Sequence, residues 1–290
     1  TASSFGTTDT ATGAWIPMPY TGTYGANGFY LNFKDNTSTT TLGYDYSGNA
    51  NNWTTNNISL TSGSTYDSML DVPTPWVGYS TTTDTTAVTR GNYCVLSQLD
   101  KGSAIVISNG NLTMNNGSSY TNWGRASIGM TSGKWYWEQS GFTGANGLCG
   151  IALGSGANTT DPTTLSSVWA YYANSGNKYN GSSSAYGAAY TTTDTIGVAF
   201  DADAGTLTFY KNNATQGTAF TGLTSGPYFP LVAYYAGVSG GCDFNFGQRP
   251  FTYSPPSGFK ALCTTNLPTP TITNGANYFA ASTYTGNGTS

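Results

Sequence analysis

The stretch "DTIGVAFDADAGTLTFYKNN", residues 194–213, decides the fold, because two alternating apolar runs lie on either side of a short polar turn. If Asp201 pairs with Thr206 across a four-residue loop, the apolar residues of the two runs face each other on one side of a hairpin. The facing pairs are Phe200 with Leu207 and Val198 with Phe209. Asp203 can then accept backbone N–H bonds within the turn, and Gly205 can adopt the left-handed conformation that such loops need. We therefore predict a β-hairpin with one buried face.

Asp201 and Asp203 also allow two chemical interpretations. A calcium loop needs further oxygen ligands, but the polar residues that follow belong to the predicted strand. A glycosidase needs two carboxylates about 5 to 10 Å apart, one of them with a raised pKa, and Glu138 is the sole Glu of the chain. The turn is therefore the favoured role of both aspartates. A metal site shared with a distant loop and an all-Asp catalytic pair stay open as alternatives.

Composition excludes several classes of function. Of the 290 residues 38% are hydrophobic and 14% aromatic, while only 8% are charged, which indicates a folded protein with an uncharged surface. The net charge of −4 and the lack of a basic stripe argue against a nucleic-acid partner, because phosphate binding needs clustered Lys and Arg. No window approaches eighteen continuous apolar residues, so we expect no membrane insertion.

Histidine is absent, which removes Ser-His-Asp and Cys-His nucleophile systems together with His-ligated metal sites. Neither a phosphate-cradling P-loop nor a G-x-S-x-G elbow flanked by a strand and a helix occurs. We therefore expect no enzyme activity, no catalytic residue, no metal site and no cofactor. The widely spaced cysteines can form two disulfides by any of three pairings, but we favour four buried thiols. They are Cys94, Cys149, Cys242 and Cys263.

Short alternating runs bounded by Gly, Asn, Ser and Pro recur along the chain and predict an all-β, antiparallel sandwich. We expect three parts, namely an extended short-strand region over 1–90, the sandwich over 91–266, and a linker with the start of a following unit over 267–290. The expected strands are 28–33, 104–109, 134–140, 148–153, 195–200, 206–211, 229–235 and 242–247.

The order of the strands resembles that of a SPRY domain. Besides residues 194–213, the resemblance is carried by "SGKWYWEQS" (132–140), "CGIALG" (149–154), "YFPLVAYY" (228–235) and the closing run "FNFGQRPFTYSPPSGFKAL" (244–262). The resemblance implies a concanavalin A-like antiparallel β-sandwich. "KNN" stands where many members have Lys-Asn-Gly, and the span before the hairpin is richer in Ser and Tyr, so the partner-binding loops of other members do not transfer to this chain.

The flanks resemble modules in large structural proteins of tailed bacteriophages. These flanks are "TDTATGAWIPMPYTGTYGANGFYLNFKDN" (8–36), "LGYDYSGNANNWTTNNISLT" (42–61) and "DSMLDVPTP" (67–75). The resemblance implies a segment of a tail fibre or surface adhesin, located at the virion surface after assembly in the host cytoplasm. Other virion subunits are then the expected partners, and elongated fibres are commonly symmetric homo-oligomers.

Tyrosines set among Ser, Gly and Asn, as in residues 168–190, are typical of recognition loops. The predicted contact residues for a host-surface glycan or protein are Trp169, Tyr171, Tyr172, Tyr179, Tyr186 and Tyr190. Alternatively, alternate residues of this span are strand positions. The run "YDYSGNANNW" (44–53) can present amides to a glycan, although Asn and Gly in such turns commonly serve the backbone alone.

The predicted function is therefore that of a non-enzymatic virion protein which binds the host surface through loops, with modest affinity multiplied by many copies. A purely structural spacer or capsid decoration protein is the first alternative. A carbohydrate-active depolymerase is the second.

Overall fold

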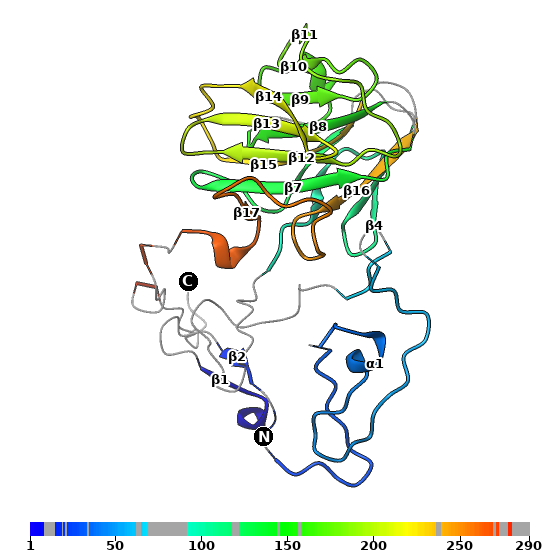
Figure 1. The fold of residues 1–290 in the computed structure, drawn as a ribbon. Coiled ribbons are helices and arrows are strands. Elements are labelled where there is room, and N and C mark those ends of the chain that lie inside the picture. Colours follow the sequence, from blue (N-terminus) through cyan, green and yellow to red (C-terminus); the bar gives the residue numbers. More distant parts are fainter. Residues whose placement is uncertain are drawn as a thin grey trace, which may run out of the picture.

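The computed structural model describes residues 1–8, 15–18, 20, 22–33, 35–61, 65–68, 92–117, 122–143, 146–155, 158–235, 239–268, 271–272 and 278–279. In these residues nearly all regular structure is β, and two large antiparallel sheets face each other (Figure 1). The predicted β-sandwich is confirmed. No helix of the described residues is long and apolar enough to cross a membrane.

One sheet has seven strands, in which β8 to β11 follow one another as neighbours and β15, β6 and β3 come from distant parts of the chain. In spatial order it contains β11 (Ser183–Ser184), β10 (Lys178–Tyr179), β9 (Val168–Tyr172), β8 (Gly147–Leu153), β15 (Tyr228–Tyr234), β6 (Trp123–Ala126) and β3 (Leu96–Lys101).

The other sheet has eight strands. In spatial order it contains β14 (Ala214–Phe220), β13 (Thr206–Lys211), β12 (Ile196–Asp201), β7 (Lys134–Ser140), β16 (Gly240–Asn245), β5 (Thr113–Asn116) and β4 (Ile105–Ser108), and β17 (Lys260–Ala261) adds a parallel pairing to β7. The short 3-10 helix η2 (Pro162–Thr164) lies between β8 and β9, and η3 (Thr264–Asn266) follows β17.

The hairpin predicted from residues 194–213 is confirmed in type and register. Asp201 pairs with Thr206, and the apolar residues pair as predicted, Phe200 with Leu207 and Val198 with Phe209. All four apolar side chains are fully buried. Gly205 has a φ of 64°, the left-handed conformation expected at the end of the turn. Period-2 alternation and a four-residue turn therefore sufficed to fix this pairing.

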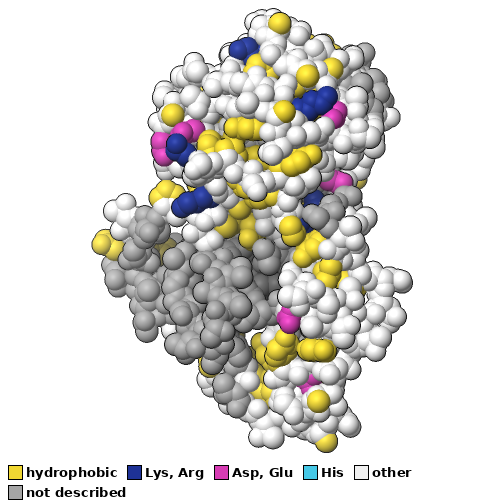
Figure 2. Space-filling view, in the orientation of Figure 1, with side chains coloured by type: hydrophobic (Ala, Val, Ile, Leu, Met, Phe, Trp, Pro, Cys, Tyr) yellow, Lys and Arg dark blue, Asp and Glu magenta, His cyan; other side chains and the backbone are white. Residues whose placement is uncertain are grey.

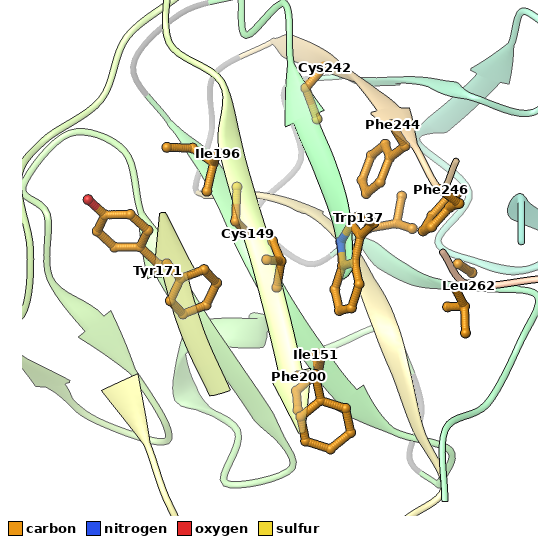
Figure 3. Packing of buried hydrophobic residues seen from close by; sticks show 14 of the residues in the cluster. Trp137, Cys149, Ile151, Tyr171, Ile196, Phe200, Cys242, Phe244, Phe246 and Leu262 are labelled. Atoms are coloured by element: carbon orange, nitrogen blue, oxygen red, sulfur yellow. The ribbon is translucent and has the colours of Figure 1, made fainter. Parts of the chain in front are cut away.

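The core lies between the two sheets (Figure 3). Trp137 from β7, Phe200 from β12 and Phe244 from β16 are completely buried, and Ile151 from β8 meets them from the opposite sheet. Each such side chain contributes about 1.5 to 3 kcal/mol by leaving water. These aromatic side chains of the strands therefore serve to pack the core.

The four cysteines are free and buried, as predicted. Burial raises the pKa of Cys94 and of Cys242 to about 12, so both thiols stay protonated at neutral pH. In Figure 3, Cys149 and Cys242 lie among the apolar side chains of the core. They act as small hydrophobic groups.

The N-terminal part contains η1 (Ala2–Ser4), the antiparallel pair β1 (Gly6–Thr8) and β2 (Trp15–Pro17), and α1 (Thr39–Leu42). The strand expected at 28–33 is wrong, because this segment makes no ladder. Instead, the backbone N–H of Tyr46 donates to the carbonyl of Tyr30, and side-chain amides from the following loop donate to the carbonyls of residues 25–28. Hydrogen bonds from side chains have replaced a partner strand.

The predicted limits 1–90, 91–266 and 267–290 stay predictions. The strands of the two large sheets extend from Leu96 to Ala261. Residues 69–91 and most of the expected following unit lie outside the described residues.

Candidate functional site

The Tyr-rich segment, residues 168–190, closes one side of the sandwich. It begins in β9, forms the short β10–β11 hairpin at the edge of the seven-stranded sheet, and then leads to β12 in the other sheet (Figure 1). The prediction of loop aromatics is therefore only partly right in its local structure. Trp169, Tyr171 and Tyr172 lie in β9 and Tyr179 lies in β10, whereas Tyr186 and Tyr190 lie outside strands.

Tyr171 and Tyr190 are buried, with 0% and 1% of their surfaces exposed. Their ring centroids lie 4.9 Å apart, and Phe209 packs 5.2 Å from Tyr171. The hydroxyl of Tyr171 donates to the carbonyl of Ala188, and the hydroxyl of Tyr190 lies 2.8 Å from the carbonyl of Tyr171. Burial raises the pKa of both phenols. These two tyrosines hold the segment to the core and offer no surface to a partner in this arrangement.

Tyr186 links the segment to the opposite sheet. Its half-buried ring lies edge-on to Tyr171 at 5.2 Å. Its hydroxyl donates to the carbonyl of Gly217 at 2.5 Å and accepts the backbone N–H of Phe209 at 3.3 Å. Burial raises the pKa of this phenol to about 12. Lys178 makes a second link, because its Nζ donates to the carbonyl of Ala219 at 2.5 Å.

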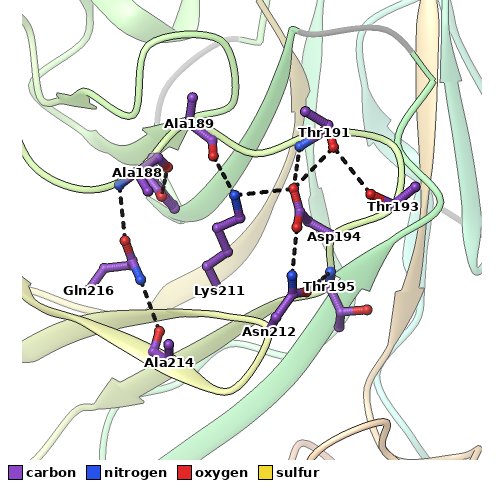
Figure 4. Close-up of polar contacts among 11 residues, drawn as sticks. Ala188, Ala189, Thr191, Thr193, Asp194, Thr195, Lys211, Asn212, Ala214 and Gln216 are labelled. Atoms are coloured by element: carbon purple, nitrogen blue, oxygen red, sulfur yellow. Dashed lines mark hydrogen bonds and ion pairs between the residues drawn. The ribbon is translucent and has the colours of Figure 1, made fainter.

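A polar network fixes the end of the segment against β13 and β14 (Figure 4). Lys211 donates to the carbonyl of Ala189 at 2.7 Å and lies 3.4 Å from the carboxylate of Asp194, while Asn212 donates to the same carboxylate at 2.6 Å. Burial opposes ionisation of Asp194, but donation from Thr191 and Asn212 and the charge of Lys211 outweigh it and lower its pKa. The network is structural, since each of its charges is held by internal partners.

The remaining aromatics lie on both faces of the seven-stranded sheet, as period-2 alternation requires. Trp169 points into the main core and is partly buried there, with its ring 5.4 Å from that of Tyr228. Tyr172 belongs to a smaller apolar cluster on the other face and packs against Tyr179 and Tyr235 at 5.9 and 4.8 Å. Tyr179 and Tyr235 are half-buried.

The longest exposed run of the segment lies in the Ser hairpin, which we define as residues 177–185. Its residues from Gly181 to Ala185 are all exposed. Asn180 nevertheless anchors its turn by donating to the carbonyls of Ser166 and Val168 at 2.7 and 2.9 Å. Gly181, in the left-handed conformation with φ 69°, donates its N–H to Leu165 at 3.0 Å. The hairpin is thus exposed but fixed in shape.

The aspartates of the 194–213 hairpin serve its turn. Asp201 Oδ1 accepts the N–H groups of Asp203 and Ala204 at 3.1 and 2.9 Å, and Oδ2 lies 3.0 Å from the ammonium of Lys134. Partial burial opposes ionisation, but the N–H of Ala204 and the charge of Lys134 lower the pKa of Asp201. Asp203 accepts the N–H of Gly133 at 2.8 Å. The turn interpretation is confirmed, and among the described residues no group of three His, Cys, Asp or Glu side chains could hold a metal ion.

Sequence reasoning gave Glu138 no structural role beyond being the sole Glu. Its carboxylate is buried on the outer face of β7, where it accepts the hydroxyl of Tyr136 and the N–H groups of Thr252 and Tyr253 at 2.8 and 2.9 Å. Burial raises its pKa despite these donors. It fastens the chain that follows β16 onto the sheet. The alternation in "KWYWEQS" was the available signal, since it places Tyr136 and Glu138 opposite the buried tryptophans.

Comparison with known proteins agrees with this architecture. Residues 134–249 match the SPRY domain family. The chain is 32% identical over 145 residues to the E3 ubiquitin-protein ligase RKP of Arabidopsis thaliana, covering 48% of the chain and 11% of that protein. It is 27% identical over 172 residues to the ATP-dependent RNA helicase DDX1 of Xenopus laevis, covering 58% and 22%. The chain spans less than a quarter of the length of the curated relatives named here.

Among solved structures, the chain is similar to the SPRY domain of human HERC1, with a TM-score of 0.47, 24% identity, and coverage of 52% of this chain and 96% of that one. It is also similar to the TRIM65 PSpry domain, with a TM-score of 0.44, 14% identity, and coverage of 53% and 92%. The family match falls on the strands from β7 to β16. Over residues 134–249 the β-sandwich of this chain is similar to the SPRY domain family.

Proposed function

We propose that this chain is a non-enzymatic binding module whose SPRY sandwich recognises a protein partner through the Ser hairpin. SPRY domains are typically protein-interaction modules, and this function fits a sandwich in which the carboxylates of Glu138, Asp194 and Asp201 are held by internal contacts. The observation that carries the proposal is that the hairpin is both exposed and anchored at its turn by Asn180 and Gly181.

Anchoring favours binding because a partner then has little backbone entropy to remove. The hairpin presents serine hydroxyls and small side chains, with the half-buried Tyr179 beside them. Tyr, Ser, Gly and Asn are the residue types that recognition loops use, since they combine apolar contact area with adaptable hydrogen bonds. Lys178 is the charged residue of the hairpin, and its ammonium already bonds Ala219. A partner with an uncharged, hydrogen-bonding surface suits this site best.

We further propose that the module belongs to a bacteriophage tail fibre or other virion surface protein, as a homo-oligomer. The flanking sequences and the small number of charged residues support this proposal. The partner is then a host-surface protein if the Ser hairpin lies at an exposed tip, and a neighbouring virion subunit if it lies between copies. Many copies on one particle would multiply a modest affinity.

A peptide library tests the binding site. Peptides selected from a random library against the whole chain are titrated by fluorescence anisotropy against Ser184→Arg, which places a large charged side chain on exposed β11. Ser108→Arg is the matched control, since Ser108 is likewise an exposed serine in a strand at a sheet edge, β4. Loss of a hot-spot contact weakens binding ~tenfold or more, so we expect that loss in Ser184→Arg alone. Failure to enrich any peptide, or equal weakening by both substitutions, contradicts the proposal.

A further inference from the structure

The N-terminal part of the chain exposes more large aromatic side chains than the sandwich does. Phe29 and Trp53 form a pair with ring centroids 4.9 Å apart and planes inclined at 57°. Phe29 is 45% exposed and Trp53 54% exposed, so the rings pack on each other and also face solvent. Tyr44 and Tyr46, at the start of the same loop, are also exposed. Figure 2 shows hydrophobic side chains at the surface below the sandwich, on the side where Figure 1 places α1.

The loop behind this pair, residues 44–53, is built around one carboxylate. Asp45 Oδ1 accepts the N–H groups of Tyr30 and Ser47, both at 2.8 Å, and Oδ2 accepts the N–H of Asn51 at 2.9 Å. Loss of solvation opposes ionisation of Asp45, but the hydrogen-bond donors, led by the N–H of Tyr30, together outweigh it and lower its pKa to about 2. The carboxylate therefore stays charged and keeps the loop in shape at neutral pH. The backbone of Trp53 is fixed at the end of the loop, because its backbone N–H donates to the carbonyl of Gly43 at 2.8 Å.

Three asparagine amides of the loop are oriented by the same framework. Asn49 donates to the carbonyls of residues 25 and 28 at 2.8 and 2.9 Å, and Asn51 donates to those of residues 26 and 28 at 3.0 and 2.9 Å. Asn52 uses the other end of its side-chain amide, because its Oδ1 accepts the backbone N–H of Asp45 at 2.9 Å. Within the described part of the chain, no partner occupies the carbonyl oxygens of the first two amides or the amino group of the third. The loop, which ends at the exposed Trp53, therefore offers two oriented acceptors and one oriented donor.

Charge decides which ligand fits this surface. Residues 22–61 contain three charged residues, Lys34, Asp35 and Asp45. The carboxylate of Asp35 accepts the N–H and hydroxyl of Thr37, at 3.1 and 2.6 Å. The carboxylate of Asp45 accepts hydrogen bonds from within its own loop, including one from the hydroxyl of Ser47. The loop has no cluster of cations for a phosphorylated or acidic ligand. Exposed rings together with oriented amides match a molecule that has C–H faces and many hydroxyls but no charge.

We propose that the Phe29–Trp53 pair and the amides of Asn49, Asn51 and Asn52 form a binding site for a neutral glycan. One sugar ring packs against the exposed indole, and its hydroxyls bond the three amides. The rigid loop keeps the entropic cost of binding low, because the amides and the rings are already in place. This site is separate from the Ser hairpin, so either one can fail without the other.

Electrophoresis of the whole chain through native gels that contain a neutral polysaccharide tests the site. Dextran, hydroxyethylcellulose, galactomannan and soluble starch serve as probes, and hyaluronan serves as the charged control. We expect at least one neutral polymer to retard the wild type, and Trp53→Ala to weaken that binding ~tenfold or more, as for a central aromatic contact. Trp15→Ala is the matched control, because Trp15 is 56% exposed and lies in β2. It should be retarded like the wild type.

Three results would overturn the proposal. The first is no retardation by any of the neutral polymers. The second is equal loss in Trp53→Ala and Trp15→Ala. The third is self-association in sedimentation velocity that Trp53→Ala abolishes without any polysaccharide binding, since the rings would then form a contact between copies. Urea unfolding of both variants confirms that the sandwich is intact, and fluorescence of the remaining tryptophans monitors that transition.

Discussion

The sandwich and the N-terminal part of this chain are held together by different forces. In the sandwich, aromatic and aliphatic side chains from two sheets are fully buried, and polar groups fasten the connections. In residues 22–61, side-chain amides and the Asp45 carboxylate bond the backbone while Phe29 and Trp53 stay exposed. Aromatic residues therefore stabilise the first region and are available for binding in the second. The role of an aromatic residue therefore depends on whether its surroundings bury it, which one segment of sequence does not reveal.

Truncating one buried and one exposed phenylalanine should show the difference between the two regions most clearly. Phe200→Ala removes a completely buried ring from the core and should lower the free energy of unfolding by about 3 to 5 kcal/mol. Phe29→Ala removes a ring of the same kind that is 45% exposed and should change it by about 1 kcal/mol or less. Urea unfolding followed by intrinsic fluorescence measures both. Similar losses in the two variants would show that the N-terminal part has a core of its own.

The link made by Tyr186 should have a smaller effect. Tyr186→Phe keeps the ring but removes the hydroxyl that bonds Gly217 and Phe209, so the sandwich should lose about 1 kcal/mol. Hydrogen exchange should also quicken at the amide of Phe209, which loses its acceptor. Tyr210→Phe, in the neighbouring position of β13, is a suitable control. Unchanged exchange at Phe209 would mean that the hydroxyl does not hold the segment.

The buried carboxylate of the sandwich predicts a pH dependence. Because burial raises the pKa of Glu138 above its unfolded value, the folded state binds more protons, and stability should fall as pH rises from about 4.5 through the raised pKa. Unfolding in urea at a series of pH values measures this slope. Glu138→Gln cannot ionise, so its slope over this range should be flatter than that of the wild type. Parallel slopes would exclude Glu138 as the source.

For the Asp45 carboxylate of the N-terminal loop, we expect a pH dependence of stability with the opposite sign. Its folded pKa is lowered to about 2, so its contribution is present above the unfolded value near 3.8 and is lost as pH falls through about 2. Amide exchange at Tyr30, Ser47 and Asn51 should therefore lose protection over that range, while the sandwich strands remain protected. Asp45→Ala should remove this protection at neutral pH. Protection that persists in the variant would show that other bonds hold the loop.

The predictable part of the fold is the part in which local pattern and global packing agree. Residues 194–213 were read correctly because apolar alternation, turn chemistry and burial all select one register. Residues 28–33 were also expected to form a strand, but side-chain amides from a loop about twenty residues away bond the carbonyl of Gly28, and the N–H of Tyr46 bonds that of Tyr30. The two-residue strands β10 and β11 are too short to give any periodic signal.

Composition could point to a segment with exposed residues but not to which of its side chains are exposed. Composition directed attention to residues 168–190, and the exposed Ser hairpin lies within that span. However, Tyr171 and Tyr190 face the core, because their partners, Phe209 in β13 and Phe142 after β7, come from other parts of the sequence. Contact across the sandwich cannot be read from one segment. Which of the six aromatic residues contact a partner stays a prediction.

Hydrogen exchange of the whole chain, with and without a peptide selected for binding, tests most directly whether the sandwich binds through the Ser hairpin. We expect the peptide to slow exchange most at the amides of residues 177–185 and of residues 165–168, which anchor them. Protection concentrated at the opposite sheet edge around β4, or spread over the strands without a maximum at the hairpin, would contradict it.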